Sequence, residues 1–274
     1  MNKVNEKDAK AFDNPYKVAF VAMLDSDKNI HITLLSTLMN KGKEMMFGEF
    51  VVGNSKKYIY ENPDTAFLIM SLDMKVWTGN MHFTRNATEG EDYIHYNNMP
   101  LYRYNSYFGI NKVHYADLID ISEAKPLKLV GSIMNKIAVG AKKHSLYNDN
   151  ASPALRPWVE KMMKKIDTLS FIAFMCKDGF LKMVPAIQAE SVSSSRIVLK
   201  QKPYKEELKD LKEGDKISLY ALRLDMSGVL VKGIYHKAKG DFGYIDIETV
   251  YNPLPPKPGV IYPLQPNEAV IFNS

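Results

Sequence analysis

Short apolar runs separated by polar turns dominate the first third of the chain. Runs of this kind, bounded by Gly, Pro, Asn, Asp and Ser, are typical of β-strands. The clearest turns are Asp25–Asn29 and Asn40–Lys43. The pattern predicts strands over residues 18–24, 30–39, 45–52, 66–72 and 75–83. We therefore expect a mainly β fold.

The strand pattern recurs later in the chain. Phe20–Leu24 resembles Phe171–Met175 at an offset of 151 residues, Leu72–Met74 resembles Leu224–Met226 at an offset of 152, and Gly79 and Gly233 then fall in matching strands. Nearly equal offsets at both ends of a segment indicate two copies of one β unit. The second copy has Pro203–Glu207 where the first has a basic loop, so we expect it to be degenerate.

Helical spacing separates the two copies. The apolar residues Leu127, Val130, Ile133, Met134, Ile137 and Ala141 recur at intervals of three and four. This spacing predicts one apolar helix face, which we expect to cover the barrel. A second helix is predicted to begin at Pro157, because proline suits the first helical turn.

Four segments follow from these patterns. We expect a first β domain over residues 1–122, a helical linker over 123–167, a second β unit over 168–250 and an extended tail over 251–274. The tail is rich in proline, which favours extended, polyproline-like backbone.

The most informative loop follows the third predicted strand. Asn54 and Ser55 stand where a short helix would begin, and Lys56 and Lys57 lie in its first turn. A helix N-terminus presents unpaired N–H groups and the positive end of a dipole, so it attracts anions. The loop can form a phosphate cradle; the alternative is a capped surface helix with solvated lysines.

The strand order around this loop resembles that of the FMN-binding split β-barrel family, the pyridoxamine 5′-phosphate oxidase-like proteins. Ser55-Lys56-Lys57 and the later Asn62-Pro63 carry the resemblance, which spans about residues 15–120. It implies a β-barrel with α-helical additions, here as tandem split β-barrels joined by helices. It also implies bound FMN and a homodimer.

The resemblance further implies a set of cofactor contacts. They are Thr33, Ser36, Gly48 and Glu49 for the ring and ribityl chain, and Ser55, Lys56 and Lys57 for the phosphate. The alternative for Thr33 and Ser36 is that both are ordinary strand residues. His31, Ser36 and Met74 depart from the oxidase pattern, so we do not expect oxidation of pyridoxamine phosphate.

A second cluster, Arg103, Tyr104, Asn105 and Tyr107, combines aromatic rings with a cation and is a candidate substrate pocket. The alternative is a packed loop at a subunit interface. No histidine spacing suggests a metal site, so we expect none.

The net charge of +5 is unevenly distributed. Nine Lys or Arg and two acids between Lys125 and Lys165 give +7. Such a stripe can bind nucleic acid, but we favour a solvated helix face and consider nucleic acid an improbable partner. No apolar run is long enough to span a membrane, and we expect no membrane partner. One cysteine, Cys176, in an apolar run suggests a buried thiol and a cytoplasmic protein.

Together these patterns predict an FMN-binding flavoprotein, with an FMN-dependent oxidoreductase acting on a small substrate that the sequence does not identify as the favoured activity. Two alternatives belong to other classes. One is a non-catalytic flavin- or haem-binding module. The other, less favoured, is a basic β-barrel that binds nucleic acid. The sequence does not separate FMN from a deazaflavin, because both carry a phosphate and a flat ring.

Overall fold

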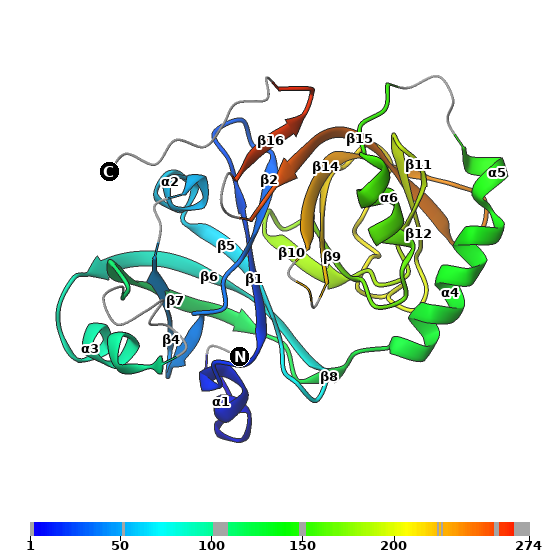
Figure 1. Cartoon of the computed structure of the whole chain (residues 1–274). Helices are drawn as coiled ribbons and strands as arrows, with labels where there is room; N and C mark the ends of the chain where they lie inside the picture. Colours follow the sequence, from blue (N-terminus) through cyan, green and yellow to red (C-terminus); the bar gives the residue numbers. More distant parts are fainter. Residues whose placement is uncertain are drawn as a thin grey trace. The chain divides into compact units, whose positions relative to one another are not determined.

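The computed structural model describes residues 3–50, 53–100, 109–147, 152–223, 225, 227–254 and 258–265. The chain divides into two compact units, one comprising Met1–Leu127 with Asp178–Met183 and the other comprising Lys128–Lys177 with Val184–Ser274. Each unit is built around an antiparallel sheet (Figure 1). The predicted fold class, tandem mainly β units joined by helices, is confirmed.

The first sheet has eight strands with three helices around it. Its strands are β1 (Val18–Leu24), β2 (Ile30–Leu34), β3 (Met39–Lys41), β4 (Glu44–Glu49), β5 (Asp64–Met70), β6 (Lys75–Ala87), β7 (Lys112–Ile121) and β8 (Lys125–Pro126). The helices are α1 (Glu6–Asp13), α2 (Asn54–Glu61) and α3 (Glu91–Asn98).

The second sheet also has eight strands. They are β9 (Leu169–Met175), β10 (Leu181–Pro185), β11 (Glu190–Ser193), β12 (Arg196–Lys200), β13 (Lys216–Leu222), β14 (Gly228–Lys237), β15 (Phe242–Asn252) and β16 (Gly259–Tyr262). Three helices precede it, α4 (Leu129–Ala141), α5 (Lys143–Leu146) and α6 (Pro157–Lys164).

The two sheets share one strand order. In the first it is β2-β1-β5-β6-β7-β4-β3, and in the second it is β10-β9-β13-β14-β15-β12-β11. The seven strands of this path have counterparts at the same places in the other sheet, whereas β8 pairs with β6 and β16 pairs with β15. The internal repeat predicted from short matches in the sequence is therefore confirmed at the level of topology.

The predicted strand over residues 18–24 coincides with β1, which pairs with both β2 and β5. The strand predicted over residues 30–39 is wrong in its second half. β2 ends at Leu34, and a turn closed by the Leu38 amide on the Leu35 carbonyl separates it from β3. Apolar residues on either side of Ser36 and Thr37 concealed this turn, because Leu35 and Leu38 are both buried within it.

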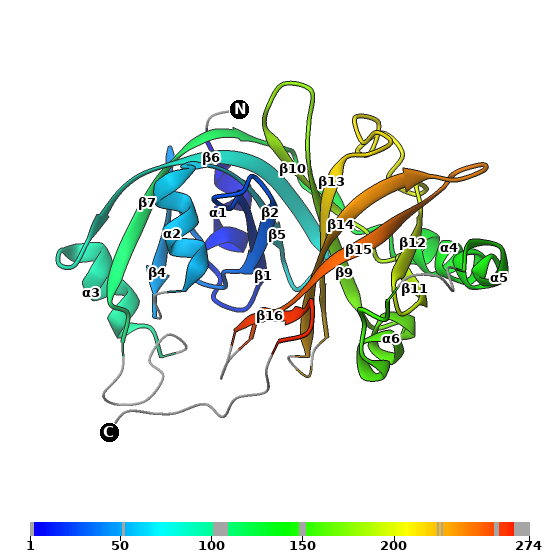
Figure 2. The same ribbon diagram turned by 90° about the horizontal axis from the view of Figure 1, so that it is seen from above.

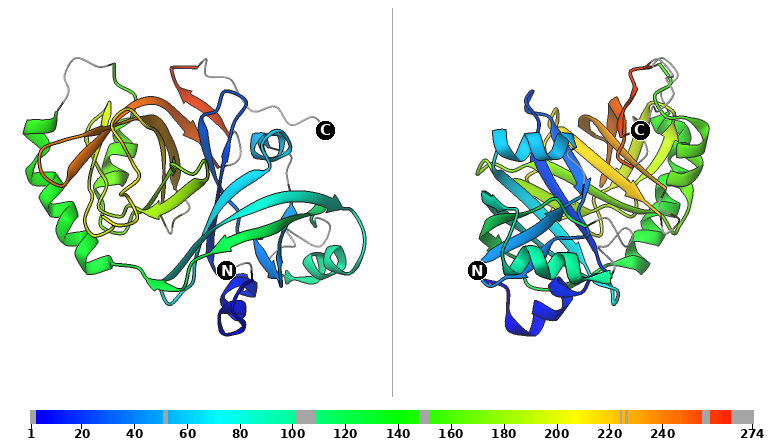
Figure 3. Two further views of the ribbon diagram at one scale, coloured as in Figure 1. Left: turned by 180° about the vertical axis from the view of Figure 1, so that it is seen from behind. Right: turned by 60° about the vertical axis from the view of Figure 1, so that its left-hand side comes forward.

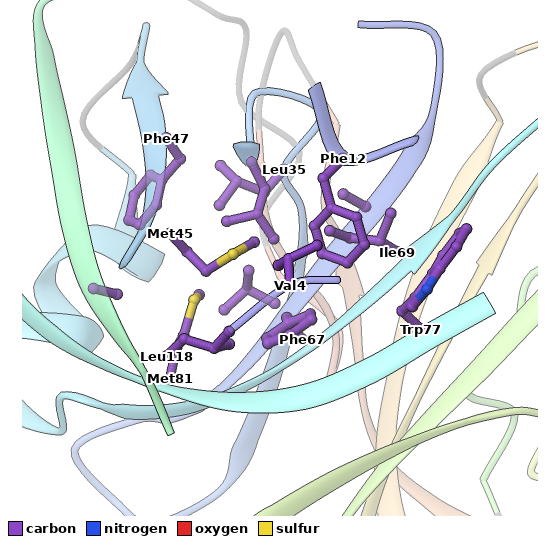
Figure 4. Close-up of a cluster of buried hydrophobic side chains, with 14 of the residues drawn as sticks. Val4, Phe12, Leu35, Met45, Phe47, Phe67, Ile69, Trp77, Met81 and Leu118 are labelled. Atoms are coloured by element: carbon purple, nitrogen blue, oxygen red, sulfur yellow. The ribbon is translucent and has the colours of Figure 1, made fainter. Parts of the chain in front are cut away.

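The core of the first unit lies between its curved strands (Figure 4). Phe12 of α1 packs edge-on against Trp77 of β6, with ring centroids 5.5 Å apart. Phe47 and Met81 belong to the same cluster. Burial of such apolar side chains is the main favourable contribution to folding, and it fixes β4, β6 and α1 around one centre.

Gly79 and Gly233 occupy matching positions on β6 and β14. A Cβ atom at Gly79 would clash with the carbonyl oxygen of Asp120 on β7, and one at Gly233 would clash with that of Asp246 on β15. The strand register shifts beside both glycines. In each unit, therefore, the absent side chain lets two neighbouring backbones approach where the ladder is irregular.

Helix α4 has the opposite orientation to the one predicted. Val130, Met134 and Ile137, expected to cover the barrel, are 79%, 65% and 64% exposed. The buried residues of the helix are instead Ser132, Lys136 and Val139. α4 lies on the outside of the second unit against β11 and β12 (Figure 3).

The segment after Val250 is partly a strand. β15 continues to Asn252, and β16 pairs with it antiparallel, with Asn252 opposite Gly259.

Cys176 is half-buried rather than buried. Within the described ranges, no helix has the length and apolar character needed to cross a membrane.

The glycine geometry makes a prediction about stability. We expect Gly79→Ala and Gly233→Ala each to lower the free energy of unfolding by about 2 kcal/mol, because a methyl group forces a backbone to move. Urea denaturation followed by circular dichroism measures the change. Gly259→Ala is the control, since no atom lies within 4 Å of its added Cβ. Equal stability of all three variants would contradict the view that Gly79 and Gly233 are needed for the close approach of neighbouring strands.

Candidate functional site

The predicted anion loop forms helix α2, which begins at Asn54 as expected. Its N-cap is Gly53, which has no side chain to bond the first N–H groups of the helix. The helix packs on β1 and lies within the curve of the first sheet, with β4, β5 and β7 around it (Figure 2). One side of the first turn of α2 therefore faces the interior of the first unit.

A hollow lies under this turn. It contains about 310 Å³ of space between atoms, some of it open to solvent. Its walls come from strands and from α2: Val21, Met23, Thr33, Leu35, Phe47, Ser55, Lys56, Ile59, Thr65, Met81, Phe83 and Ala116. Thr33, Ser55 and Lys56, three of the predicted residues, are thus brought together.

Lys56 is the unusual member of this wall. Its side chain is buried, and its Nζ lies 5.6 Å from the centroid of the Phe47 ring. Among the described residues, its ammonium group has neither a hydrogen bond nor an ion pair. Burial lowers the pKa of Lys56, and the nearby Glu49 carboxylate acts in the opposite direction. A buried cation of this kind is costly unless an anion compensates it.

Glu49 is buried beside it and fully engaged on β7. Asn111 Nδ2 donates to Glu49 Oε1 at 3.0 Å, and His114 Nε2 lies 2.9 Å from Oε2. The imidazole of His114 stacks on Phe47, with centroids 4.9 Å apart and planes 11° apart. Each carboxylate oxygen of Glu49 therefore has its own donor.

The protonation states of this pair follow from its environment. Burial raises the pKa of Glu49, but the hydrogen bonds from Asn111 and His114 outweigh it, and the pKa lies below its ordinary value. Burial lowers the pKa of His114 to about 4, despite the hydrogen bond to Glu49. At neutral pH, a neutral His114 donates from Nε2 to the carboxylate. Its Nδ1 is then a buried acceptor that has no hydrogen-bond partner in the part of the chain that the structure describes.

The other predicted cofactor contacts lie outside the hollow. Lys57 is exposed and pairs with Glu61 at 3.7 Å. Ser36 is exposed in the turn after β2. Gly48 is buried, its carbonyl accepts from the Thr37 hydroxyl, and a Cβ there would come within 2.8 Å of the Ile110 side chain. Packing against Ile110 therefore accounts for the glycine at position 48 without any contact to a cofactor.

The predicted substrate cluster, Arg103, Tyr104, Asn105 and Tyr107, lies outside the described residues. In the parts of the chain that are described, no group of three or more His, Cys, Asp or Glu side chains is placed to hold a metal ion.

Sequence reasoning missed His114 and Asn111. His114 lies near the start of β7, and Asn111 directly precedes this strand. Both are more than 60 positions from Glu49 in the sequence. The signal lies in the strand register: His114 is opposite Phe47 and Lys112 is opposite Glu49. Residues two apart on one strand share a sheet face, but this pairing is visible only once β7 is known to lie next to β4.

The second unit does not repeat the site. After β12 the chain forms turns between Lys202 and Lys212, where the first unit has α2. The cradle residues therefore have no helical counterpart there, as expected from Pro203–Glu207.

No family model and no curated protein matches this chain. Solved structures resemble parts of it. An FMN-binding protein from Syntrophomonas wolfei is 14% identical with a TM-score of 0.38, covering 44% of this chain and 86% of its own. HupZ of Group A Streptococcus is 14% identical with a TM-score of 0.35, covering 43% and 91%. The motility inhibitor MotI/DgrA of Bacillus subtilis is 4% identical with a TM-score of 0.25, covering 84% and 86%. At this level of similarity none of them identifies a family.

The buried histidine makes a prediction about pH. The folded pKa of His114 is about 4, below its ordinary value of 6.5. The unfolded chain therefore binds more protons between these values, and stability falls as pH drops from about 6.5 to 4. We expect His114→Gln, which can still donate to Glu49, to reduce this loss by about 3 kcal/mol. Urea denaturation at several pH values measures it.

His95 provides the matched control, because it is an exposed histidine on α3. We expect His95→Gln to retain the pH dependence of the unaltered protein. An identical acid-induced loss in the His114→Gln variant would show that His114 is not held neutral in the folded state.

Proposed function

We propose that this protein binds FMN in the first unit and serves as a flavoprotein. The observation that supports this most strongly is Lys56, a buried cation that lines a hollow and has no hydrogen-bond or ion-pair partner among the described residues. A phosphate group would supply the missing anion. The proposal thus rests on the chemistry of the site.

The residues of α2 fit a phosphate. The Ser55 hydroxyl and the Lys56 ammonium line the same hollow, and the first N–H groups of the helix have no side-chain cap. Hydroxyl, ammonium and helix N–H donors together are a recurrent set for phosphate recognition. Lys57, exposed and paired with Glu61, would add long-range attraction rather than a direct bond.

The remaining wall fits a flat, largely apolar ring. Phe47, Phe83 and Met81 contribute apolar surface, and Thr33 contributes a hydroxyl. When bound, a flavin supplies the redox chemistry, while the protein supplies binding, orientation and exclusion of water.

The finer parts of the proposal follow from the resemblance described above. The protein would be a cytoplasmic homodimer, reduce or oxidise a small organic substrate, and use Arg103, Tyr104, Asn105 and Tyr107 at the substrate pocket. Ser36, Gly48 and Glu49 remain predicted ring contacts. For Glu49 the role would be indirect, through His114.

Flavin binding can be tested by absorbance. The purified chain is mixed with FMN, excess is removed by gel filtration, and the visible spectrum of the protein fraction is recorded. We expect co-elution of flavin. Lys56→Gln should weaken binding by about 10- to 100-fold, the loss expected for one charge-assisted hydrogen bond. Fluorescence titration with FMN provides the dissociation constants.

Lys43→Gln is the control, because it removes one exposed lysine from the turn before β4. We expect its FMN affinity to match that of the unaltered protein. A protein that stays colourless and does not quench FMN fluorescence would overturn the proposal. The same titration with a deazaflavin and with haem would then identify which alternative cofactor is retained.

A further inference from the structure

The outward face of α4 is apolar. Val130, Met134 and Ile137 are spaced by four and three residues, which places them on one side of a helix. All three are more than 60% exposed. A contiguous apolar stripe of this kind on a helix indicates a surface that something else covers. The alternative is that α4 could turn about its axis and bury this stripe. The contacts made by the opposite face of the helix test that alternative.

The opposite face is held by specific contacts. The side chain of Lys136 is buried, and its Nζ donates to the carbonyl of Lys165 at 2.9 Å. The carboxylates of Glu190 and Asp167 attract the same ammonium group. Turning α4 so that its apolar stripe faced inward would remove Lys136 from these partners. The outward position of the stripe is therefore fixed by polar contacts on the inward side.

Charge around this helix has one sign. Between Lys125 and Tyr147 the sequence has lysines at 125, 128, 136, 142 and 143 and no Asp or Glu. The carboxylates that α4 meets act on its buried or paired lysines: Glu190 and Asp167 on Lys136, and Glu207 on Lys128 at 3.9 Å. Lys142, at the C-terminal end of α4, is exposed.

We propose that the outward face of α4 docks on an anionic lipid surface. Exposed apolar side chains beside lysines are the combination that lets a helix lie in the interface of a charged membrane. Charge complementarity selects this occupant over a second copy of the chain, because the segment from Lys125 to Tyr147 has lysines but no Asp or Glu, so two copies would bring like charges together. From the sequence we expected no membrane partner, because no apolar run is long enough to span a membrane.

The proposal is tested by co-sedimentation of the full chain with vesicles. One set contains phosphatidylcholine alone, and the other contains phosphatidylcholine with about a third phosphatidylserine. We expect binding only to the second set. Lys142→Gln should weaken it about fivefold, the loss expected for one lysine near the surface. Met134→Gln with Ile137→Gln should weaken it at least tenfold without any change of charge.

Leu72→Gln with Ile94→Gln is the matched control, because it replaces two exposed apolar residues of the first unit. We expect it to bind vesicles like the unaltered chain. Circular dichroism checks that each variant is folded. Equal binding of the α4 and control variants, or no preference for phosphatidylserine, would overturn the proposal. So would a dimer in gel filtration that Met134→Gln with Ile137→Gln dissociates, in the absence of vesicle binding.

Discussion

Everything in the first unit depends on the pairing of β7 with two neighbours at once. One edge of β7 bonds to β6 and the other to β4, so this strand alone joins the group β2-β1-β5-β6 to the hairpin β4-β3. Backbone N–H and C=O groups need partners when buried, and a strand with neighbours on both edges satisfies them. Gly79 lets β6 approach β7, and the β4 edge brings His114 against Phe47 and Glu49. Fold closure and site assembly therefore result from the same pairing.

The second unit keeps this arrangement and changes what surrounds it. β15 joins β14 to β12 as β7 joins β6 to β4. Gly233 stands where Gly79 stands, again opposite an aspartate carbonyl. The surroundings have diverged. Turns stand in the place of α2, α4 packs on β11 and β12, and α6 packs on β11. Few side chains fit at the two glycines, where neighbouring backbones approach closely, whereas the connections between strands accept many sequences. The two copies accordingly share topology but not chemistry.

How far the sequence predicted these features depended on the range of the interactions involved. Strand β1 and the starts of α2 and α6 were predicted correctly, because a short apolar run between turns, the Asn54-Ser55 pair and a proline in the first helical turn act within a few residues. The break after Leu34 was missed, because both turn leucines are apolar. The orientation of α4 was predicted wrongly, because buried Lys136 donates to the carbonyl of Lys165, which is distant in sequence. Of the candidate site, Ser55, Lys56 and Thr33 do line one hollow, while His114 could be found only through the strand register.

The arrangement of Glu49 explains why Lys56 remains available to a ligand. A buried carboxylate next to a buried ammonium group would ordinarily form an ion pair and use up the cation. Here Asn111 occupies one oxygen of Glu49 and His114 the other. Both donors come from the β7 side, so Glu49 acts on Lys56 through its charge without a hydrogen bond among the described residues. That charge favours the ammonium form of Lys56 in an apolar wall. Glu49 thus offsets part of the effect of burial on the pKa of Lys56, while the Lys56 ammonium group forms no hydrogen bond with Glu49 among the described residues.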